Sequence, residues 1–190
     1  MGDQNPRQKD SSVKRLAPLV AAAGPTDGGT LTTRHGKIEF SRRTVIMGIL
    51  NITPDSFYDG GRRSNVGEAT RDGIAMAQAG AEIIDIGGES TRPGSRPVPA
   101  EEELERILPV LRELRREVKV PISIDTYKSK VAQATLEAGA DIVNDISALR
   151  FDAEMISVIA REQVPVVLMH MQGTPRTMQA EPRYDDVVRE

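Results

Sequence analysis

The stretch that decides the fold is Glu-Ile-Ile-Asp-Ile-Gly-Gly-Glu-Ser-Thr-Arg-Pro-Gly-Ser-Arg, residues 82–96. It begins as a short apolar run that reaches Asp85, which is typical of a buried strand, and continues into a loop rich in glycine and hydroxyl residues. Glycine lets backbone N–H groups approach a ligand closely because no Cβ stands in the way. The planar fork of donors on Arg92 suits phosphate. The stretch therefore predicts a strand whose carboxyl end leads into a polar binding loop.

Short apolar runs alternate with helical patterns on both sides of this stretch. The runs predict strands over residues 45–50, 82–86, 121–125, 141–143 and 165–169. The helical patterns cover residues 66–79, 100–118, 129–138 and 153–161. The run 45–50 is apolar throughout, as expected of a strand buried on both faces. In the clearest helix, 100–118, apolar residues recur every three or four positions, and Pro109 should kink it.

Several finer expectations concern single helices and the two ends of the chain. The helix 153–161 should bury Met155, Ile156 and Ile159, and residues 185–190 should begin another helix. The arginines within 112–116 are expected to form a solvated helix face. Residues 1–29 should be a flexible extension. Residues 30–41 alternate around His35 and Gly36 and predict a β-hairpin, with His35 in its turn.

An internal echo links two of the predicted strands. Residues 79–85 read Ala-Gly-Ala-Glu-Ile-Ile-Asp, and residues 138–144 read Ala-Gly-Ala-Asp-Ile-Val-Asn. Helix end, glycine, strand and terminal polar residue recur in the same order. Both segments should therefore adopt the same local geometry, from a helix end through a glycine into a strand.

The alternation of strands and helices predicts βα units on a parallel sheet. A Gly-x-Gly-x-x-Gly motif does not follow the first parallel strand, and a Walker loop is absent, which disfavours nucleotide-binding doubly wound folds. We therefore expect an α/β fold of the (β/α)8 TIM-barrel class. Such barrels take about 250 residues, so this chain should hold an incomplete barrel of about five of eight βα units, preceded by the hairpin.

Composition narrows the classes of protein to which the chain can belong. Its 190 residues are 38% hydrophobic and 28% charged, which is typical of a globular domain. The net charge of −3 argues against a nucleic-acid surface. Cysteine is absent, which excludes disulfides and thiolate catalysis. Apolar runs are too short to span a membrane, and the run 16–23 is broken by Pro18, unlike a signal peptide. We therefore expect a cytoplasmic protein.

Polar side chains stand where the predicted strands end. These residues are Asn51, Asp85, Asp125 and Asn144. The carboxyl ends of parallel strands meet at one rim, so the four should face a common pocket. Asp125 with Asn144 can read a heterocycle with an N–C–N edge, because a carboxylate accepts hydrogen bonds and an amide both donates and accepts. Arg92 can hold an anion at the other end, which suggests a flat, nitrogen-rich ligand that bears phosphate.

Each of these residues also has a structural alternative. Asp125 can cap the helix that follows it, Asp85 can bond the backbone of its own loop, and Asn144 can stabilise a turn. Asn51 can belong to an Asx turn, and Arg92 can be a solvated loop charge. His170 is interpreted as a structural histidine rather than a base.

Four segments, in this order and spacing, resemble the dihydropteroate synthase family. They are MGILNITPDSF (47–57), DIGGESTRPG (85–94), PISIDT (121–126) and AGADIVNDI (138–146). The resemblance covers residues 30–190, which implies a pterin-binding barrel domain with a hairpin near its bottom. It also implies the condensation of 6-hydroxymethyl-7,8-dihydropterin pyrophosphate with p-aminobenzoate to 7,8-dihydropteroate and pyrophosphate.

The resemblance implies roles for the rim residues. Asp125 and Asn144 would read the pterin, Asp85 would support them, and Asn51 would bind a Mg²⁺ ion completed by water and pyrophosphate. The other substrate-binding residues that it implies are Phe57, Thr91, Arg92, Pro93, Ile146 and Met169. Arg92 and Asp125 would carry the catalysis, with Arg92 neutralising the leaving pyrophosphate.

The same resemblance assigns two walls of the site. Phe57 and Pro93 match positions that line the p-aminobenzoate site, where sulfonamides compete, and Met169 resembles a wall of the pterin pocket. The full-length enzyme would be a homodimer that acts on small molecules, without nucleic-acid or membrane partners.

The later motifs of the family do not occur in this sequence. They are an Asp-Pro-Gly segment, a Ser-Arg-Lys segment, and a final Arg and His. We therefore expect an N-terminal portion that is inactive alone and that associates through open sheet edges. Two other interpretations stay open: the pterin-binding domain of a methyltetrahydrofolate–corrinoid methyltransferase, and a non-catalytic fragment that binds a pterin or a partner. The loop 91–94 and the segment 51–57 argue against the first.

Overall fold

The architecture is an incomplete α/β barrel beneath which a small hairpin is packed. The computed structural model describes residues 29–40, 43–52, 62–90 and 97–189. The hairpin pairs β1 (Thr30–Thr32) with β2 (Lys37–Glu39) antiparallel. The parallel strands are β3 (Met47–Asn51), β4 (Ile83–Gly87), β5 (Ile122–Asp125), β6 (Ile142–Asp145) and β7 (Val166–Leu168). The helices are α1 (Arg62–Gln78), α2 (Ala100–Glu117), α3 (Ser129–Glu137) and α4 (Glu154–Glu162).

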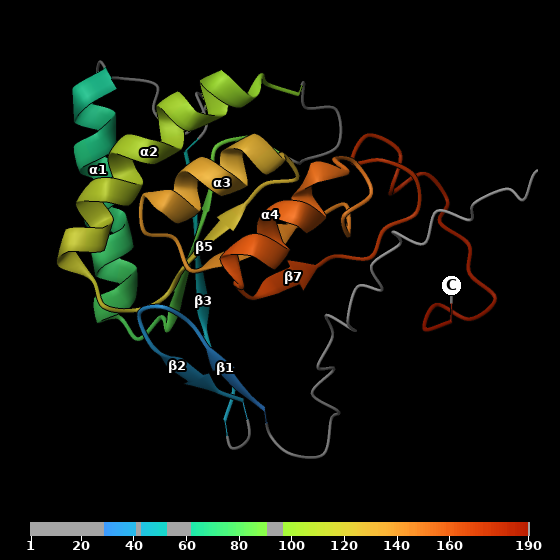
Figure 1. Cartoon of the computed structure of the whole chain (residues 1–190), viewed down its shortest axis with the longest axis horizontal. Helices are drawn as coiled ribbons and strands as arrows, with labels where there is room; N and C mark the ends of the chain where they lie inside the picture. Colours follow the sequence, from blue (N-terminus) through green and yellow to red (C-terminus); the bar gives the residue numbers. More distant parts are fainter. Residues whose placement is uncertain (1–28, 41–42, 53–61, 91–96, 190) are drawn as a thin grey trace, which may run out of the picture.

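The order of the parallel strands distinguishes a barrel from a doubly wound fold. The strands lie in the sequence order β3-β4-β5-β6-β7, and all four helices pack on one side of the sheet (Figure 1). A doubly wound sheet instead reverses its strand order and carries helices on both faces. The prediction of a barrel-type sheet of five βα strands is therefore confirmed.

The main core lies between the sheet and the helices. Alternate strand residues point to this side, such as Ile84 and Ile86 of β4 and Ile122 and Ile124 of β5, and all four are fully buried. The helices add their apolar stripes, of which that of α2 is the longest. This two-residue alternation leaves the intervening strand positions on the opposite, concave face. None of the helices in the described ranges is both long and apolar enough to cross a membrane.

The hairpin covers the amino end of the concave face. Ile38 of β2 is 2% exposed and packs with Ile83 of β4 and Ile142 of β6 in a second, smaller core. The predicted hairpin is therefore confirmed, and it forms an apolar floor. Above this floor the concave face becomes polar, starting with Asp85 and Ser123, which are paired in register between β4 and β5.

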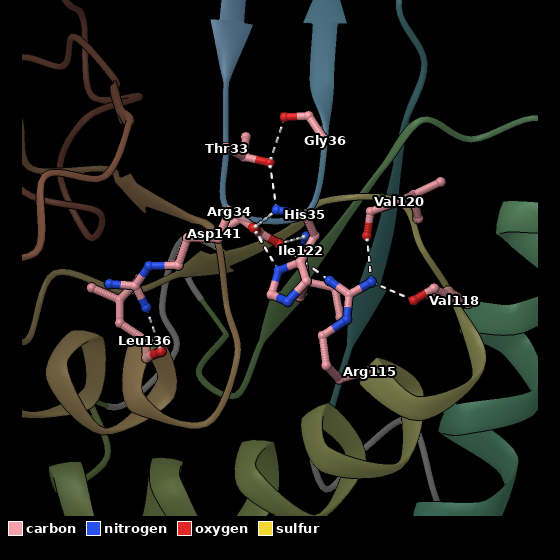
Figure 2. Close-up of polar contacts among 10 residues, drawn as sticks. All are labelled: Thr33, Arg34, His35, Gly36, Arg115, Val118, Val120, Ile122, Leu136 and Asp141. Carbon is pink, nitrogen blue, oxygen red and sulfur yellow. Dashed lines mark hydrogen bonds and ion pairs between the residues drawn. The ribbon is translucent and has the colours of Figure 1, made fainter.

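Asp141 links the hairpin to the rest of the fold (Figure 2). This side chain is fully buried and accepts from Nδ1 and the backbone N–H of His35, at 2.8 and 3.1 Å. It also accepts from Arg115 at 3.2 Å and from the N–H of Ile122 at 3.0 Å. His35 therefore has the structural place expected of a turn residue. Arg115 corrects the expectation of a solvated face over residues 112–116, because its side chain is only 13% exposed.

Arg34 fastens the hairpin to the helical layer. Its guanidinium donates to the carbonyl oxygen of Leu136 at the end of α3, at 3.0 Å, and to Glu162 at the end of α4, at 2.7 Å. The hairpin turn thus contacts α3 and α4 through Arg34. Through His35 it bonds Asp141, which in turn accepts from Arg115 of α2 and Ile122 of β5.

The internal echo corresponds to two equivalent pieces of structure. Gly80 and Gly139 follow α1 and α3 with φ values of +105° and +108°, a conformation that glycine adopts at little cost. Each is followed by a strand of the parallel sheet, β4 or β6. The expectation that both segments adopt the same local geometry is therefore confirmed.

Three local expectations were wrong. The strand predicted over 45–50 is not buried on both faces: Ile49 of β3 is 61% exposed, because β3 has one neighbour in the described sheet and its concave side is uncovered. Ile156 of α4 is 51% exposed, and Val158 takes the buried position instead. Residues 185–189 form turns rather than the start of a helix.

Candidate active site

The register of the sheet brings the predicted rim residues into one row. Asn51 of β3 pairs with Gly87 of β4, Gly87 with Asp125 of β5, and Asp125 with Asn144 of β6. These residues end neighbouring parallel strands, so their side chains share the carboxyl edge of the concave face. The predicted convergence of Asn51, Asp125 and Asn144 is therefore observed in the structure.

Asp85 lies one layer below this row and is joined to it by Asn144. The Nδ2 amide of Asn144 donates to Oδ2 of Asp85 at 3.1 Å. Asp85 is 4% exposed, and its Oδ1 has no hydrogen-bond partner within the described ranges. Burial raises the pKa of Asp85, although hydrogen bonds to the carboxylate act in the opposite direction. Asp85 and Asn144 occupy equivalent positions of the internal echo. The hydrogen bond therefore joins the ends of the two repeated segments.

One carboxylate oxygen of Asp125 lacks a hydrogen-bond partner among the described residues. Its Oδ1 is buried and accepts no hydrogen bond from any residue that the structure describes. Burial, reinforced by the charges of nearby carboxylates with Asp85 first among them, raises the pKa of Asp125 to about 7. Unpartnered buried carboxylate oxygens are rare in native proteins unless a ligand or ion completes them. Asp125 is therefore a strong candidate for ligand binding.

The structural alternative for Asp125 does not hold. The helix α3 begins at Ser129, whose N–H donates to Oδ2 of Asp152 at 2.8 Å. The N–H of Lys128 donates to Oγ1 of Thr126 at 3.2 Å. The first turn of α3 thus uses other acceptors, which leaves the carboxylate of Asp125 directed to the rim.

Gly87 keeps space open between two of these polar residues. A Cβ atom at this position would lie 3.5 Å from Oδ1 of Asn51 and 3.6 Å from Oδ2 of Asp125. The absence of a side chain therefore creates room between an amide oxygen and a carboxylate. A flat ligand can enter here without displacing the backbone.

Asp145 is a rim carboxylate with a purely structural role. It is fully buried, and its two oxygens accept from the backbone N–H groups of Ser147 and Leu149, at 2.7 and 2.9 Å. These bonds hold a turn in which Ala148 and Leu149 have positive φ values of 51° and 65°. Asp145 and Asp125 therefore differ in function although both end strands.

The remaining predicted site residues fall into two groups. Ile146, which is 6% exposed, follows β6, and the half-buried Met169 follows β7, where its N–H donates to the carbonyl oxygen of Asp145 at 3.1 Å. Both therefore lie at the carboxyl edge, beside Asn144. The residues Phe57, Thr91, Arg92 and Pro93 lie outside the described ranges.

Sequence reasoning missed two acidic residues beside the site. Glu89 and Glu103 are 8% and 1% exposed and share the ammonium group of Lys128. Glu89 lies within the loop that follows β4, so an acid in a binding loop was a usable signal. No such signal marks Glu103 in the sequence, because an acidic residue in the first turn of a helix is ordinarily explained by the helix dipole.

The described residues offer limited ligands for a metal ion. They contain no cluster of three or more His, Cys, Asp or Glu side chains that could hold one. Asn51 nevertheless presents a hard amide oxygen at the exposed end of β3, next to the space above Gly87. Mg²⁺ commonly keeps several waters and takes one or two protein ligands plus phosphate oxygens. Asn51 therefore fits a Mg²⁺ ion that arrives with a phosphorylated ligand.

The fold and the rim assign the chain to the α/β-barrel type, with a row of polar residues at the carboxyl edge of its sheet. A model of the family described as "Pterin binding enzyme" matches residues 47–190. The chain therefore belongs to the pterin-binding enzyme family.

Relatives in this family are dihydropteroate synthases. The chain is 49% identical to the dihydropteroate synthase of Synechocystis over 152 residues, which is 80% of this chain and 53% of that protein. It is 48% identical to the Bacillus subtilis enzyme over 73% of this chain and 48% of that protein. The chain spans about half the length of these curated relatives.

Solved structures of the same enzyme share the fold. A Yersinia pestis dihydropteroate synthase with a sulfonamide drug complex matches with a TM-score of 0.76 at 45% identity, over 85% of this chain and 58% of that one. A Xanthomonas albilineans enzyme in complex with 7,8-dihydropteroate matches with a TM-score of 0.70 at 39% identity, over 85% and 55%.

Proposed function

We propose that this chain supplies the pterin-binding part of a dihydropteroate synthase, over residues 30–190. The reaction joins 6-hydroxymethyl-7,8-dihydropterin pyrophosphate to p-aminobenzoate and releases pyrophosphate. The observation that carries the proposal is the hydrogen-bonded Asp85–Asn144 pair beside the unpartnered, buried oxygen of Asp125. The relatives named above are enzymes of this activity, which supports the proposal.

The proposed recognition of the pterin follows from the donors and acceptors on the rim. The carboxylate of Asp125 would accept from the ring N–H and exocyclic amino groups of the pterin, which satisfies its free oxygen. Asn144 donates to Asp85 through Nδ2, so its Oδ1 is left to accept from the ring. Asp85 thus orients the amide of Asn144. Ile146 and Met169 are proposed as apolar walls, and the gap above Gly87 would admit the edge of the ring.

The proposed chemistry asks the protein for charge neutralisation rather than for a strong base. Pyrophosphate leaves the pterin methylene, and the weakly basic arylamine nitrogen attacks that carbon and later loses a proton. Arg92, with Thr91, is proposed to neutralise the leaving pyrophosphate, while Phe57 and Pro93 are proposed to line the p-aminobenzoate site. Asn51 is the proposed ligand for Mg²⁺, which would supply positive charge to the pyrophosphate oxygens.

Two further parts of the proposal are a cytoplasmic location and a homodimeric full-length protein. The first is the default expectation from the composition of the chain, and the second rests on the family resemblance. Light scattering of the full-length protein in solution tests the second part, since it measures mass directly.

Calorimetry with the purified chain tests the proposed function. We expect binding of 6-hydroxymethyl-7,8-dihydropterin pyrophosphate that strengthens with Mg²⁺ and little or no turnover with p-aminobenzoate. Binding that ignores Mg²⁺ would favour a non-catalytic pterin-binding fragment, and preferential binding of methyltetrahydrofolate would favour the corrinoid methyltransferase domain. Absence of pterin binding would refute the proposal. Turnover by the 190-residue chain would refute its expected inactivity.

A further inference from the structure

Lys128 joins two buried carboxylates that come from different parts of the fold. Its ammonium contacts Glu89, in the segment after β4, and Glu103, in the first turn of α2. The Lys128 side chain is 16% exposed, and those of Glu89 and Glu103 are 8% and 1% exposed. Three charged groups from three segments are thus removed from water together, close enough to Asp125 for the charges of Glu89 and Glu103 to act on its carboxyl group.

Glu89 makes further contacts that tie neighbouring segments together. Its Oε1 accepts from the hydroxyl of Tyr127 at 2.9 Å, and its Oε2 accepts from the N–H of Val98 at 3.4 Å. Val98 shortly precedes α2, whereas Tyr127 and Lys128 follow β5. Next to Glu89, the carbonyl oxygen of Gly88 accepts from Arg106 of α2 at 2.7 Å. Residues 88–89 and residue 98 are therefore fastened to α2 and to the end of β5.

The charges of this cluster are mutually dependent. Burial alone would lower the pKa of Lys128, but hydrogen bonds and charge from Glu103 and Glu89 outweigh it and raise that pKa. Burial raises the pKa of Glu103, and Lys128 opposes the increase. A buried ion pair gives little net stability compared with well-packed apolar side chains, whereas loss of one partner is costly. The cluster is therefore better suited to fixing a geometry than to adding stability.

We propose that Glu89 and Lys128 are positioning residues that hold the start and the end of the β4–α2 connection relative to the strand-borne rim residues. The inference rests on the proposed function, in which the anion-binding Thr91 and Arg92 follow Glu89 in the sequence. Asp85, Asp125 and Asn144 stand on strands whose register does not depend on Glu89. Loss of the cluster should therefore weaken binding of pyrophosphate and leave binding of the pterin ring intact.

The experiment compares two ligands on the same protein. The affinities of 6-hydroxymethyl-7,8-dihydropterin and of its pyrophosphate with Mg²⁺ are measured by calorimetry for the wild type, Glu89→Gln, Lys128→Met and the double variant. We expect about a tenfold to hundredfold loss of affinity for the pyrophosphate, as for a lost charge-assisted hydrogen bond, and less than a twofold change for the pterin alone. The double variant should lose no more than the worse single variant, because the two residues act as one unit.

The chain supplies a matched control pair. Lys130 of α3 and Glu101 of α2 form an ion pair two residues away from Lys128 and Glu103 in the sequence, but their side chains are 63% and 66% exposed. Glu101→Gln and Lys130→Met should leave both affinities unchanged. Lys128→Arg, which keeps the positive charge, should recover part of the affinity for the pyrophosphate and shows the effect even if Lys128→Met folds poorly.

The outcomes separate the inference from the function on which it rests. A wild type that binds neither ligand refutes the proposed function and the inference with it. If the wild type binds both ligands, equal losses for both in Glu89→Gln, or no loss for either, refute the inference alone. Additive losses in the double variant also refute it, because they would show that Glu89 and Lys128 act independently.

Discussion

The two ends of the parallel sheet treat buried carboxylates in opposite ways. At the amino end, Asp141 is fully buried and accepts from His35, Arg115 and the backbone of Ile122 (Figure 2). At the carboxyl end, Asp125 has a buried oxygen that accepts nothing from the described residues. The first arrangement is complete without a ligand, whereas the second leaves an interaction to be made.

This difference separates stability from binding within one sheet. A satisfied buried carboxylate joins elements, and its loss exposes several donors at once. An unsatisfied one is a cost to the fold that a ligand can recover, which is the usual relation between stored strain and function. Barrel folds generally place stability at the amino end of the strands and chemistry at the carboxyl end. Each variant below changes one end and leaves the other intact.

The largest effect is expected from Asp141→Ala. The substitution leaves the guanidinium of Arg115, which is 13% exposed, without its carboxylate, and it orphans the N–H of Ile122. We expect a loss of about 3–5 kcal/mol in the free energy of unfolding, as for a broken buried ion pair. Urea denaturation followed by circular dichroism measures this loss. Pterin affinity should be unchanged under conditions in which the variant stays folded.

Glu82→Ala is the matched control for Asp141→Ala. Glu82 occupies the equivalent position of the internal echo, but its partner Arg43 is 64% exposed. Exposed ion pairs contribute little, so this variant should unfold like the wild type. A comparable loss in both variants would contradict the view that burial and multiple donors give Asp141 its importance.

Asp125→Asn should have the next largest effect, and at the opposite end of the sheet. The amide keeps the shape but offers a donor where the pterin also presents donors. We expect about a tenfold to hundredfold loss of pterin affinity, measured by calorimetry, the range for hydrogen bonds to a charged group. Stability should not fall, because Asp125 makes no contact that the amide removes. A variant that unfolds more easily at pH 8 would show that Asp125 is structural.

The raised pKa of Asp125 also predicts how the stability of the protein changes with pH. The pKa of Asp125 is raised from 3.8 to about 7, so the folded protein keeps a proton that the unfolded chain has already released. Stability should therefore fall as the pH rises from about 4 to about 7 and then level off. Asp125→Asn should lack this fall. Identical pH profiles of unfolding for the wild type and the variant would contradict the raised pKa.

The sequence predicts the carboxyl end of the sheet better than the amino end, because its signals are local in the sequence. Residues that end strands, such as Asp125 and Asn144, are marked by the apolar runs before them, and the register then brings them together. The pairing of Arg115 with Asp141 has no such mark, because 26 residues separate them and an arginine on a helix usually faces water. The exposure of Ile49 also escaped prediction, since an apolar run does not reveal that its strand lies at an edge.

Two neighbouring glycines at the end of β4 allow stability and binding to be compared at adjacent positions. A Cβ on Gly88 would lie 2.9 Å from Cγ1 of Ile107 and 3.0 Å from Cγ of Glu103, on the helix side. Gly88→Ala should therefore cost about 1–3 kcal/mol of unfolding free energy through overpacking. Gly87→Ala meets only ordinary contacts, so it should keep stability but lose pterin affinity by filling the space between Asn51 and Asp125. Thermal unfolding and calorimetry on both variants test whether Gly88→Ala loses stability while Gly87→Ala loses affinity. Equal losses of stability in the two variants would contradict this prediction.

The smallest effect is expected from Asn144→Ala, which removes the hydrogen bond between the two halves of the echo. The Nδ2 group of Asn144 donates to Oδ2 of Asp85 at 3.1 Å, and Oδ1 of Asp85 accepts no hydrogen bond from the described residues. We expect a loss of about 1 kcal/mol, because Asp85 can take up a proton once the amide is gone. The bond favours the ionised form of Asp85, so its removal raises the pKa of Asp85 further. The loss should therefore be larger at pH 8 than at pH 5, as measured by urea denaturation at both values. An equal loss at the two pH values would mean that Asn144 stabilises the rim by packing alone, and that the Asp85 carboxylate does not orient it.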